Sequence, residues 1–365
     1  MKSVSRLDGM PAYTPIEPLD VLSKRLGIPE DQIIKLDANE NPYGPSPKAV
    51  EALTNLQNTH IYPDPESRNL RAGVEQYTNV PAKNLLMGAG ADELIDLLLR
   101  IMLEPGDAVI NLPPTFGMYA FGTRLNAGSL IEVPRKTDFS IDLEAVQQAC
   151  EIYQPKIIFV TTPNNPSGNL PTRREIEVLL DLPSLIVLDE AYIEFCDNGG
   201  KFGEENSWIQ HVPQRENLVV LRTFSKWAGL AGLRIGYAAF PDWLYPALWK
   251  AKQPYNVNVA ADAAALASLN DLDHLSLIME QLRSSRQWLY SQLQEIPYLQ
   301  PYPSQTNFIL CRVLSRCAQT LKQELEAKGI LVRYYQNKYL EDMIRISVGQ
   351  PQSLETLMYT LKETI

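Results

Sequence analysis

The sequence is poor in the residues that usually mark a metal or disulfide site. It holds 4 cysteines, with no CxxC pair, and 3 histidines (His60, His211 and His274). Zinc sites and disulfide frameworks need such residues at short, regular spacings. The sequence therefore predicts no metal and no disulfide framework, and we expect the cysteines to be free thiols.

Long apolar runs and clusters of positive charge are also missing. No apolar stretch approaches the ~20 residues of a membrane span, and the opening MKSVSRLDGMPAYTP lacks the apolar segment of a secretory signal. Lysine and arginine form no runs, and the net charge of −10 disfavours nucleic acid and anionic membranes as partners. We expect a cytoplasmic protein that holds any anionic ligand with a few placed cations.

The sequence does contain a series of short, apolar, β-branched runs that alternate with helical patterns. Runs that are apolar on both faces are typical of parallel strands covered by helices on both sides, so we predict an α/β fold with a mainly parallel sheet. The strand candidates span 108–112, 129–133, 156–162, 184–192, 217–223 and 235–240, and the clearest helices span 91–103, 174–182 and 272–296.

The length of 365 residues exceeds what one small core needs and predicts a large domain with a smaller one attached. We expect residues 1–47 to form an N-terminal arm and part of the small domain. Residues 48–270 would form the large domain that holds the site. Residues 271–365 would form a small α+β domain that begins with the long helix.

The stretch LRTFSKWAGLAGLRIGY (221–237) places Lys226 directly after a strand candidate. A lone lysine is normally an exposed surface residue. Here Ser225 precedes it, and Arg234 follows beyond two glycines, so the chain can fold back and direct a hydroxyl and a guanidinium at one anion. A lysine beside a bound phosphate suits Schiff-base chemistry with an aldehyde, provided that its pKa is lowered.

A second candidate anion site lies in MGAGADELI (87–95), a small-residue turn that opens a helix. The free backbone N–H groups of Ala91 and Asp92, together with the helix dipole, favour an anion there. A dinucleotide-binding loop is the rival interpretation, but Glu93 stands where its third glycine belongs. A plain helix cap is the simplest alternative.

Three further stretches carry side chains suited to a planar, cationic ring. Asp189 ends a strand candidate at the edge where open α/β sheets bind ligands, and it is suited either to pair with a protonated pyridine nitrogen or to cap a helix. Tyr192 and Asn165 can hydrogen-bond a phenolic oxygen, although PNNP alone indicates a turn. Phe116 is suited to stack on the ring or to pack in the core.

These motifs together resemble the fold-type I pyridoxal-phosphate (PLP) aminotransferases over nearly the whole chain. The resemblance is carried by Ser225-Lys226 with Arg234, PNNPSG (163–168), LDEAY (188–192) and GADE (90–93). It implies a large domain built on a mainly parallel, mixed, seven-stranded sheet and a smaller α+β domain. It also implies that Lys226 bonds the PLP aldehyde and then moves the substrate proton, with Asp189 and Tyr192 as the other catalytic residues.

Within that family, five segments resemble the histidinol-phosphate aminotransferases: KLDANENPYGPS (35–46), YPDP (62–65), PPTFGMY (113–119), DEAYIEF (189–195) and IRISVG (344–349). This resemblance implies transfer of an amino group from L-histidinol phosphate to 2-oxoglutarate, in histidine biosynthesis, by a homodimer with shared sites. The implied cofactor residues are Ala91, Asp92, Ser225, Arg234, Phe116, Asp189, Asn165, Tyr192, Lys226 and, from a neighbouring subunit, Tyr62. The implied substrate residues are Tyr13, Asn41, Arg333 and Arg345.

Several alternatives share part of this pattern. An aromatic-amino-acid aminotransferase or a threonine-phosphate decarboxylase would use the same fold and the same lysine. The broken glycine pattern disfavours a nicotinamide dehydrogenase, and the lack of a basic helix-turn-helix stretch disfavours a DNA-binding regulator. One departure from the family is Phe116, where a tyrosine is common, so that stacking is kept while any contact of a hydroxyl is lost.

Overall fold

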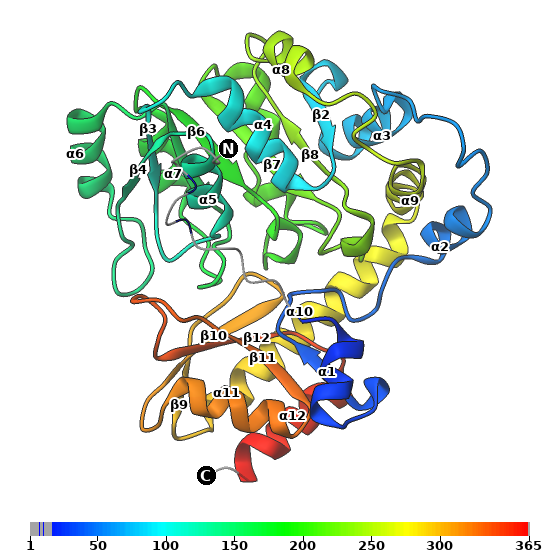
Figure 1. Cartoon of the computed structure of the whole chain (residues 1–365), viewed down its shortest axis with the longest axis vertical. Coiled ribbons are helices and arrows are strands. Elements are labelled where there is room, and N and C mark those ends of the chain that lie inside the picture. Colours follow the sequence, from blue (N-terminus) through cyan, green and yellow to red (C-terminus); the bar gives the residue numbers. More distant parts are fainter. Residues whose placement is uncertain (1–6, 8–9, 11–16, 364–365) are drawn as a thin grey trace, which may run out of the picture.

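The computed structural model describes residues 7, 10 and 17–363 and contains two β-sheets joined by a long helix (Figure 1). The strands of the larger sheet are β2 (Leu85–Gly88), β3 (Ala108–Asn111), β4 (Ser129–Glu132), β5 (Ile157–Thr161), β6 (Leu185–Asp189), β7 (Leu218–Thr223) and β8 (Gly236–Ala239). Their order in the seven-stranded sheet is β2-β8-β7-β6-β5-β3-β4. Only β8 runs antiparallel to its neighbours, so the α/β class and the mixed, mainly parallel sheet are confirmed.

Six of these strands coincide with the apolar runs of the sequence to within a few residues. The seventh, β2, was not expected, because its four residues stand directly before a glycine-rich turn and give too short a signal. The run 184–192 is shorter as a strand than expected, since β6 ends at Asp189. The chain turns there, and Asp189 therefore lies at the carboxyl edge of the sheet.

Helices cover both faces of the larger sheet. The face under α4 (Ala91–Met102), α5 (Met118–Leu125) and α8 (Tyr245–Ala251) is packed with one apolar cluster, which includes Val187 and Val219. The neighbouring strand residues Leu188 and Val220 point to the opposite face, as the period of a strand requires. Their apolar cluster lies under α2 (Pro47–Thr54), α3 (Arg68–Thr78), α6 (Leu143–Tyr153), α7 (Arg173–Leu180) and α9 (Val259–Leu269).

The smaller sheet has the order β1-β11-β12-β10-β9 and is largely antiparallel. Its strands are β1 (Ile34–Leu36), β9 (Leu299–Pro301), β10 (Phe308–Val313), β11 (Ile330–Tyr334) and β12 (Met343–Ser347). Strand β1 pairs in parallel with β11, so a segment near the start of the chain joins the C-terminal sheet. The three-part division of the chain at residues 47 and 270 stays a prediction.

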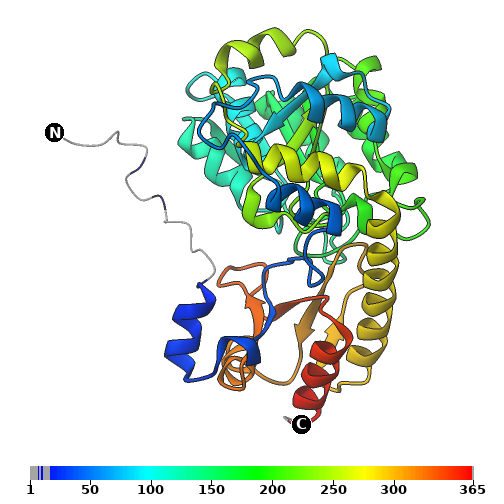
Figure 2. The same cartoon turned by 90° about the vertical axis from the view of Figure 1, so that its right-hand side faces the viewer.

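Figure 2 shows the long helix α10 (Leu272–Gln294) running from the larger sheet down along the smaller one. The smaller sheet is further accompanied by α1 (Leu19–Leu26), α11 (Ala318–Ala327) and α12 (Pro351–Glu363). Short 3-10 helices occupy the loops: η2 (Glu30–Gln32), η3 (Ala82–Asn84), η4 (Ile193–Phe195), η5 (Glu204–Asn206), η6 (Ile209–Gln214) and η7 (Ala231–Leu233). Across the described residues, none of the helices combines the length and the apolar character needed to cross a bilayer.

Candidate active site

A cleft of about 610 Å³ opens between the two sheets. One wall is the carboxyl edge of the larger sheet, where β5, β6 and β7 end, and the opposite wall comes from β11, β12 and the loop that joins them. This is where parallel strands and the helix N-termini that follow them converge. The cleft brings together eleven of the residues predicted from the sequence: Ala91, Asp92, Phe116, Asn165, Asp189, Tyr192, Ser225, Lys226, Arg234 and, from the smaller sheet, Arg333 and Arg345.

Lys226 reaches the cleft from the loop after β7. Its Nζ donates to the carbonyl oxygen of Ala38 at 3.3 Å. Burial, and then the positive charge of Arg345, lowers the pKa of Lys226 to about 8. A minor fraction of the amine is therefore uncharged at pH 7, far more than for an ordinary lysine, as a nucleophilic lysine requires.

The loop of Lys226 is held from behind by the segment 41–44. Gly229 has a φ of +68°, and a Cβ there would collide with the carbonyl oxygen of Gly44. Asn41 donates its Nδ2 to the carbonyl oxygen of Trp227 at 3.0 Å. The glycine and the asparagine thus fix the turn that presents the lysine.

The N-terminus of α4 forms an anion site next to Arg234. The first N–H groups of a helix, here those of Ala91 and Asp92, have no carbonyl partner within the helix. Arg234 Nη2 lies 2.9 Å from Asp92 Oδ2 at the same helix end. Gly90, with a φ of +81°, permits this approach, because a Cβ there would come within 2.6 Å of Arg234 Nη2. Ser225 adds a buried hydroxyl to the cleft wall.

Asp189 is a buried carboxylate that receives two hydrogen bonds from behind. Its Oδ1 accepts from the N–H of Ala191 at 3.0 Å, and its Oδ2 accepts from the hydroxyl of Tyr119 at 2.6 Å. Burial raises the pKa of Asp189 to about 6, while these two hydrogen bonds oppose the rise. The carboxylate is therefore prepared for a positive charge that approaches through the cleft.

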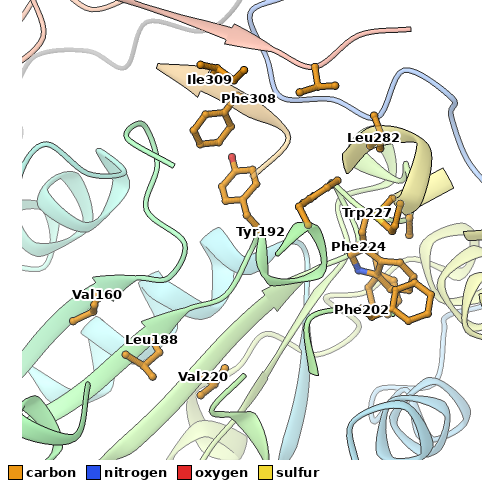
Figure 3. Close-up of a cluster of buried hydrophobic side chains, with 14 of the residues drawn as sticks. Val160, Leu188, Tyr192, Phe202, Val220, Phe224, Trp227, Leu282, Phe308 and Ile309 are labelled. Atoms are coloured by element: carbon orange, nitrogen blue, oxygen red, sulfur yellow. The ribbon is translucent and has the colours of Figure 1, made fainter. Parts of the chain in front are cut away.

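Tyr192 stands between the two sheets, and Figure 3 shows its ring extending towards Phe308 of β10. The two ring centroids are 5.2 Å apart at 90°. The hydroxyl of Tyr192 accepts from Asn39 Nδ2 at 3.1 Å and from Asn165 Nδ2 at 3.4 Å. Burial raises the pKa of Tyr192 to about 12, so its hydroxyl keeps its proton near neutral pH.

Arg333 and Arg345 are direct cross-strand partners on β11 and β12. Both side chains therefore point to the same side of the sheet, and both line the cleft. Arg345 donates to Asn165 Oδ1 at 2.8 Å and to the carbonyl oxygen of Asp37 at 2.7 Å. Arg333 lies 5.6 Å from the ring centroid of Tyr335. Two cations placed opposite each other repel unless an anion joins them, which indicates a strongly anionic ligand.

Two of the predicted residues, Asn41 and Tyr62, do not line this cleft, and a third falls where the structure is not described. Tyr13 lies outside the described residues. Asn41 faces the carbonyl oxygen of Trp227 and does not line the cleft. Tyr62 is 77% exposed and stacks on Tyr255 with ring centroids 4.6 Å apart, away from the cleft.

The structure also reveals contacts that the sequence did not indicate. Asn39, two residues before Asn41, is the asparagine that contacts Tyr192. Tyr119 contacts Asp189 from α5, and Tyr335 lines the cleft beside both arginines. Phe116 precedes α5 and Tyr119 lies in its first turn, so closeness in the sequence is the one signal that marks Tyr119 as a neighbour of the site.

Comparisons with known proteins agree with this geometry. The family described as aminotransferase class I and II matches residues 31–361. A chloroplastic histidinol-phosphate aminotransferase of Nicotiana tabacum is 48% identical over 351 residues, covering 96% of this chain and 83% of the relative. The histidinol-phosphate aminotransferase of Roseiflexus castenholzii is 47% identical, covering 96% of this chain and 95% of the relative.

Among solved structures, the histidinol-phosphate aminotransferase from Sinorhizobium meliloti in complex with pyridoxal-5'-phosphate superposes with a TM-score of 0.89 at 26% identity. The superposition covers 100% of this chain and 98% of that one. Sequence, fold and cleft thus agree, and the chain belongs to the aminotransferase class I and II family.

Proposed function

We propose that this enzyme transfers the amino group of L-histidinol phosphate to 2-oxoglutarate, giving imidazole acetol phosphate and glutamate, with PLP as its cofactor. The observation that carries the proposal is the pair Arg333 and Arg345, which face Lys226 across one cleft. The relatives that are 47% and 48% identical carry the name of this activity.

The residues of the cleft fit PLP. When bound, PLP supplies an aldehyde and a pyridine ring that accepts electrons. The α4 N-terminus, Ser225 and Arg234 would hold its phosphate, because together they offer backbone N–H groups, a hydroxyl and a guanidinium. Phe116 would stack on the ring.

The catalytic roles follow from the environment of each side chain. Lys226 Nζ, with its pKa lowered to about 8, would bond the aldehyde and, once released by the substrate amine, carry a proton from the substrate Cα. The oxygens of Asp189 would hold the proton of the pyridine nitrogen. Tyr192 and Asn165 would orient the phenolic oxygen, since both lie at the same point of the cleft.

The two arginines account for the two substrates of a transamination. Arg345 is buried and fixed by two hydrogen bonds, so it suits the carboxylate of glutamate in a bidentate contact. Arg333 adds the second positive charge that the phosphate of histidinol phosphate requires. An amino acid without a phosphate would leave the repulsion between the arginines less fully compensated.

The exposed Tyr62 supports an assembly of two copies. Tyr62 and the neighbouring Ile61 are 77% and 55% exposed. An aromatic side chain of this exposure, placed away from its own cleft, is available to the cofactor phosphate of a second copy. We propose a homodimer with shared sites on this basis. The cytoplasmic location expected from the sequence stays a prediction that cell fractionation tests.

Steady-state kinetics with four amines tests the substrate. We expect kcat/KM for histidinol phosphate to exceed that for histidine by about 100-fold or more, because the arginine pair is left without its phosphate in histidine. A preference for phenylalanine would instead identify an aromatic-amino-acid aminotransferase. Release of CO₂ from threonine phosphate would identify a decarboxylase.

A matched pair of variants locates the phosphate contact. Arg333→Gln should remove most of the preference for histidinol phosphate over histidine. Arg312→Gln is the control, because Arg312 lies on the same small sheet, pairs with Asp342 and does not line the cleft. Equal effects of the two variants would contradict the assignment of Arg333.

A further inference from the structure

We propose that Tyr119 is a positioning residue of this enzyme, which holds Asp189 as an oriented carboxylate for the pyridine nitrogen of the cofactor. The proposal rests on the proposed function and adds to it a residue to which the sequence assigned no role. Three observations carry it: the packing of the Tyr119 ring against two aromatic side chains, the geometry of its hydrogen bond, and its place as the one side-chain donor to Asp189 among the described residues.

The ring of Tyr119 is fixed on two sides. It is fully buried in the first turn of α5 and stacks on Phe159, with centroids 4.6 Å apart and planes within 5°. Its edge meets Phe116 at 5.6 Å and 80°. Tyr119 therefore touches both the residue assigned to ring stacking and the carboxylate assigned to the ring nitrogen.

The hydroxyl of Tyr119 makes a short, charge-assisted hydrogen bond. It donates to Asp189 Oδ2 at 2.6 Å, a distance typical of a hydroxyl that bonds an ionised carboxylate. The N–H of Ala191 holds the other oxygen at 3.0 Å. With each oxygen held by one donor, the plane of the carboxylate is fixed and its remaining lone pairs are left for the cleft.

The hydrogen bonds behind Tyr119 are compatible with this direction. An ionised carboxylate only accepts, so the proton of Tyr119 is directed to Asp189. Thr161 Oγ1, 3.0 Å from the hydroxyl of Tyr119, must then be the donor in that contact. Thr115 Oγ1 lies 2.9 Å from Thr161 Oγ1 and donates its own proton to Asn164 Oδ1 at 2.9 Å.

Within the part of the chain that the structure describes, Tyr119 alone donates a side-chain hydrogen bond to Asp189. The acidic groups that act on Asp189 are Asp92 from α4 and Glu190 from its own strand end, and both raise its pKa. Tyr192 is protonated, and Lys226 lines the same cleft. The hydrogen bond from Tyr119 is the foremost influence that opposes the effect of burial.

The test is the variant Tyr119→Phe, which keeps both ring contacts and removes only the hydroxyl. PLP is added to ligand-free protein and its dissociation constant is followed by absorbance between pH 5.5 and about 9, a range that spans the titration of a carboxyl with a raised pKa. We expect affinity at pH 7 to fall about tenfold or more, and its loss in acid to move to higher pH, because more Asp189 is protonated. Tyr245→Phe is the control, since it removes a hydroxyl that donates to the carbonyl oxygen of Leu85 outside the cleft.

Two further variants keep the test decisive. In an Asp189→Asn background, Tyr119→Phe should cause no further loss of PLP affinity, whereas a role in packing alone would still show its full effect. If Tyr119→Phe does not fold, Thr161→Val should produce a smaller shift of the acid limb in the same direction.

Unchanged affinity and an unchanged acid limb in folded Tyr119→Phe, or in Thr161→Val, would overturn the proposal. Failure of the wild-type protein to bind PLP would refute the proposed function instead. The two results are therefore distinguishable.

Discussion

Two consecutive carboxylates at the end of β6 face different surroundings. Asp189 points into the cleft and receives only the hydroxyl of Tyr119 and one backbone N–H. Glu190 points away from the cleft and is fully satisfied within the protein. It accepts from Ser207 Oγ at 2.6 Å and from the N–H of Trp208 at 2.7 Å, and it pairs with Arg222 at 3.0 Å.

The difference distinguishes a carboxylate of the active site, Asp189, from one that stabilises the fold, Glu190. Both carboxylates are buried, but only Glu190 has an internal cation. Arg222 belongs to β7 and is followed closely by Lys226, so its ion pair with Glu190 fixes the two strand ends relative to each other. Asp189 is left with a pKa raised to about 6, which a cationic ligand would lower. A charge that lacks its partner in the folded protein therefore indicates where the ligand supplies it.

The largest effect is expected at the cleft, for Lys226→Ala. Turnover should fall by about 10⁴-fold, since both the bonding amine and the proton carrier are lost. The protein should still fold and bind PLP, because the lysine contributes one long hydrogen bond to the fold. Single-turnover kinetics measures the loss, and full activity of the variant would refute the mechanism.

On the supporting side, Arg222→Leu should destabilise the ligand-free protein by about 3–5 kcal/mol, because Glu190 is left buried without its cation. Glu194, which lies 3.6 Å from Arg222 and whose pKa burial raises to about 8, loses the same neighbour. Adding Glu190→Gln to Arg222→Leu should restore part of the loss. Urea denaturation of Arg222→Leu, of Glu190→Gln and of the double variant measures these losses of stability. If the loss in the double variant equals the sum of the two single losses, the pairing is contradicted.

Asp189→Asn should have the opposite effect on stability from Arg222→Leu. Burial raises the folded pKa of Asp189 to about 6, above the ordinary value of a carboxyl, so this carboxyl stabilises the fold at low pH and loses that contribution as pH rises from about 4 to 6. At pH 8 the ligand-free variant should therefore be more stable than the wild type by up to about 3 kcal/mol, and the difference should vanish near pH 4.

The same substitution should lower turnover by about 100-fold, because the amide no longer provides a negative charge for the ring nitrogen. A variant that is less stable than the wild type at pH 8, with turnover intact, would remove the distinction between the two carboxylates. Denaturant midpoints measured across pH give the first quantity, and kcat gives the second.

The smallest effect is expected for Arg234→Lys at the α4 N-terminus. A lysine keeps the charge but loses the fork that can hold both Asp92 and a phosphate oxygen. PLP affinity should fall about tenfold, with stability nearly unchanged. Titration of ligand-free protein with PLP measures the change, and inorganic phosphate should compete with PLP less well in the variant.

The sequence predicts the strands of the larger sheet well because their apolar runs are local signals. It also predicts that Asp189 ends one strand and that Ser225 and Lys226 follow another, at the carboxyl edge of the sheet. That these two strands are neighbours is known from the structure. The role of Tyr119 could not be predicted, because its partner Asp189 is 70 residues away along the chain.

Strand register, backbone turns and the assembly of two copies also depend on contacts that no local sequence pattern specifies. That Arg333 and Arg345 are direct neighbours depends on the pairing of β11 with β12, which no local pattern fixes. Asn39 and Asn41 stand in one short motif, and only the turn of the backbone decides that Asn39 faces Tyr192. Tyr62 has no role within its own chain's cleft, so its assignment requires a second copy.

The central claim is that the amine of Lys226 bonds an aldehyde beside Asp189. The most direct measurement is borohydride reduction of the PLP-loaded protein, followed by mass spectrometry of its peptides. We predict one pyridoxyl label, on Lys226, and none in Lys226→Ala. A label on any other lysine, or a protein that takes up no PLP, would contradict the account.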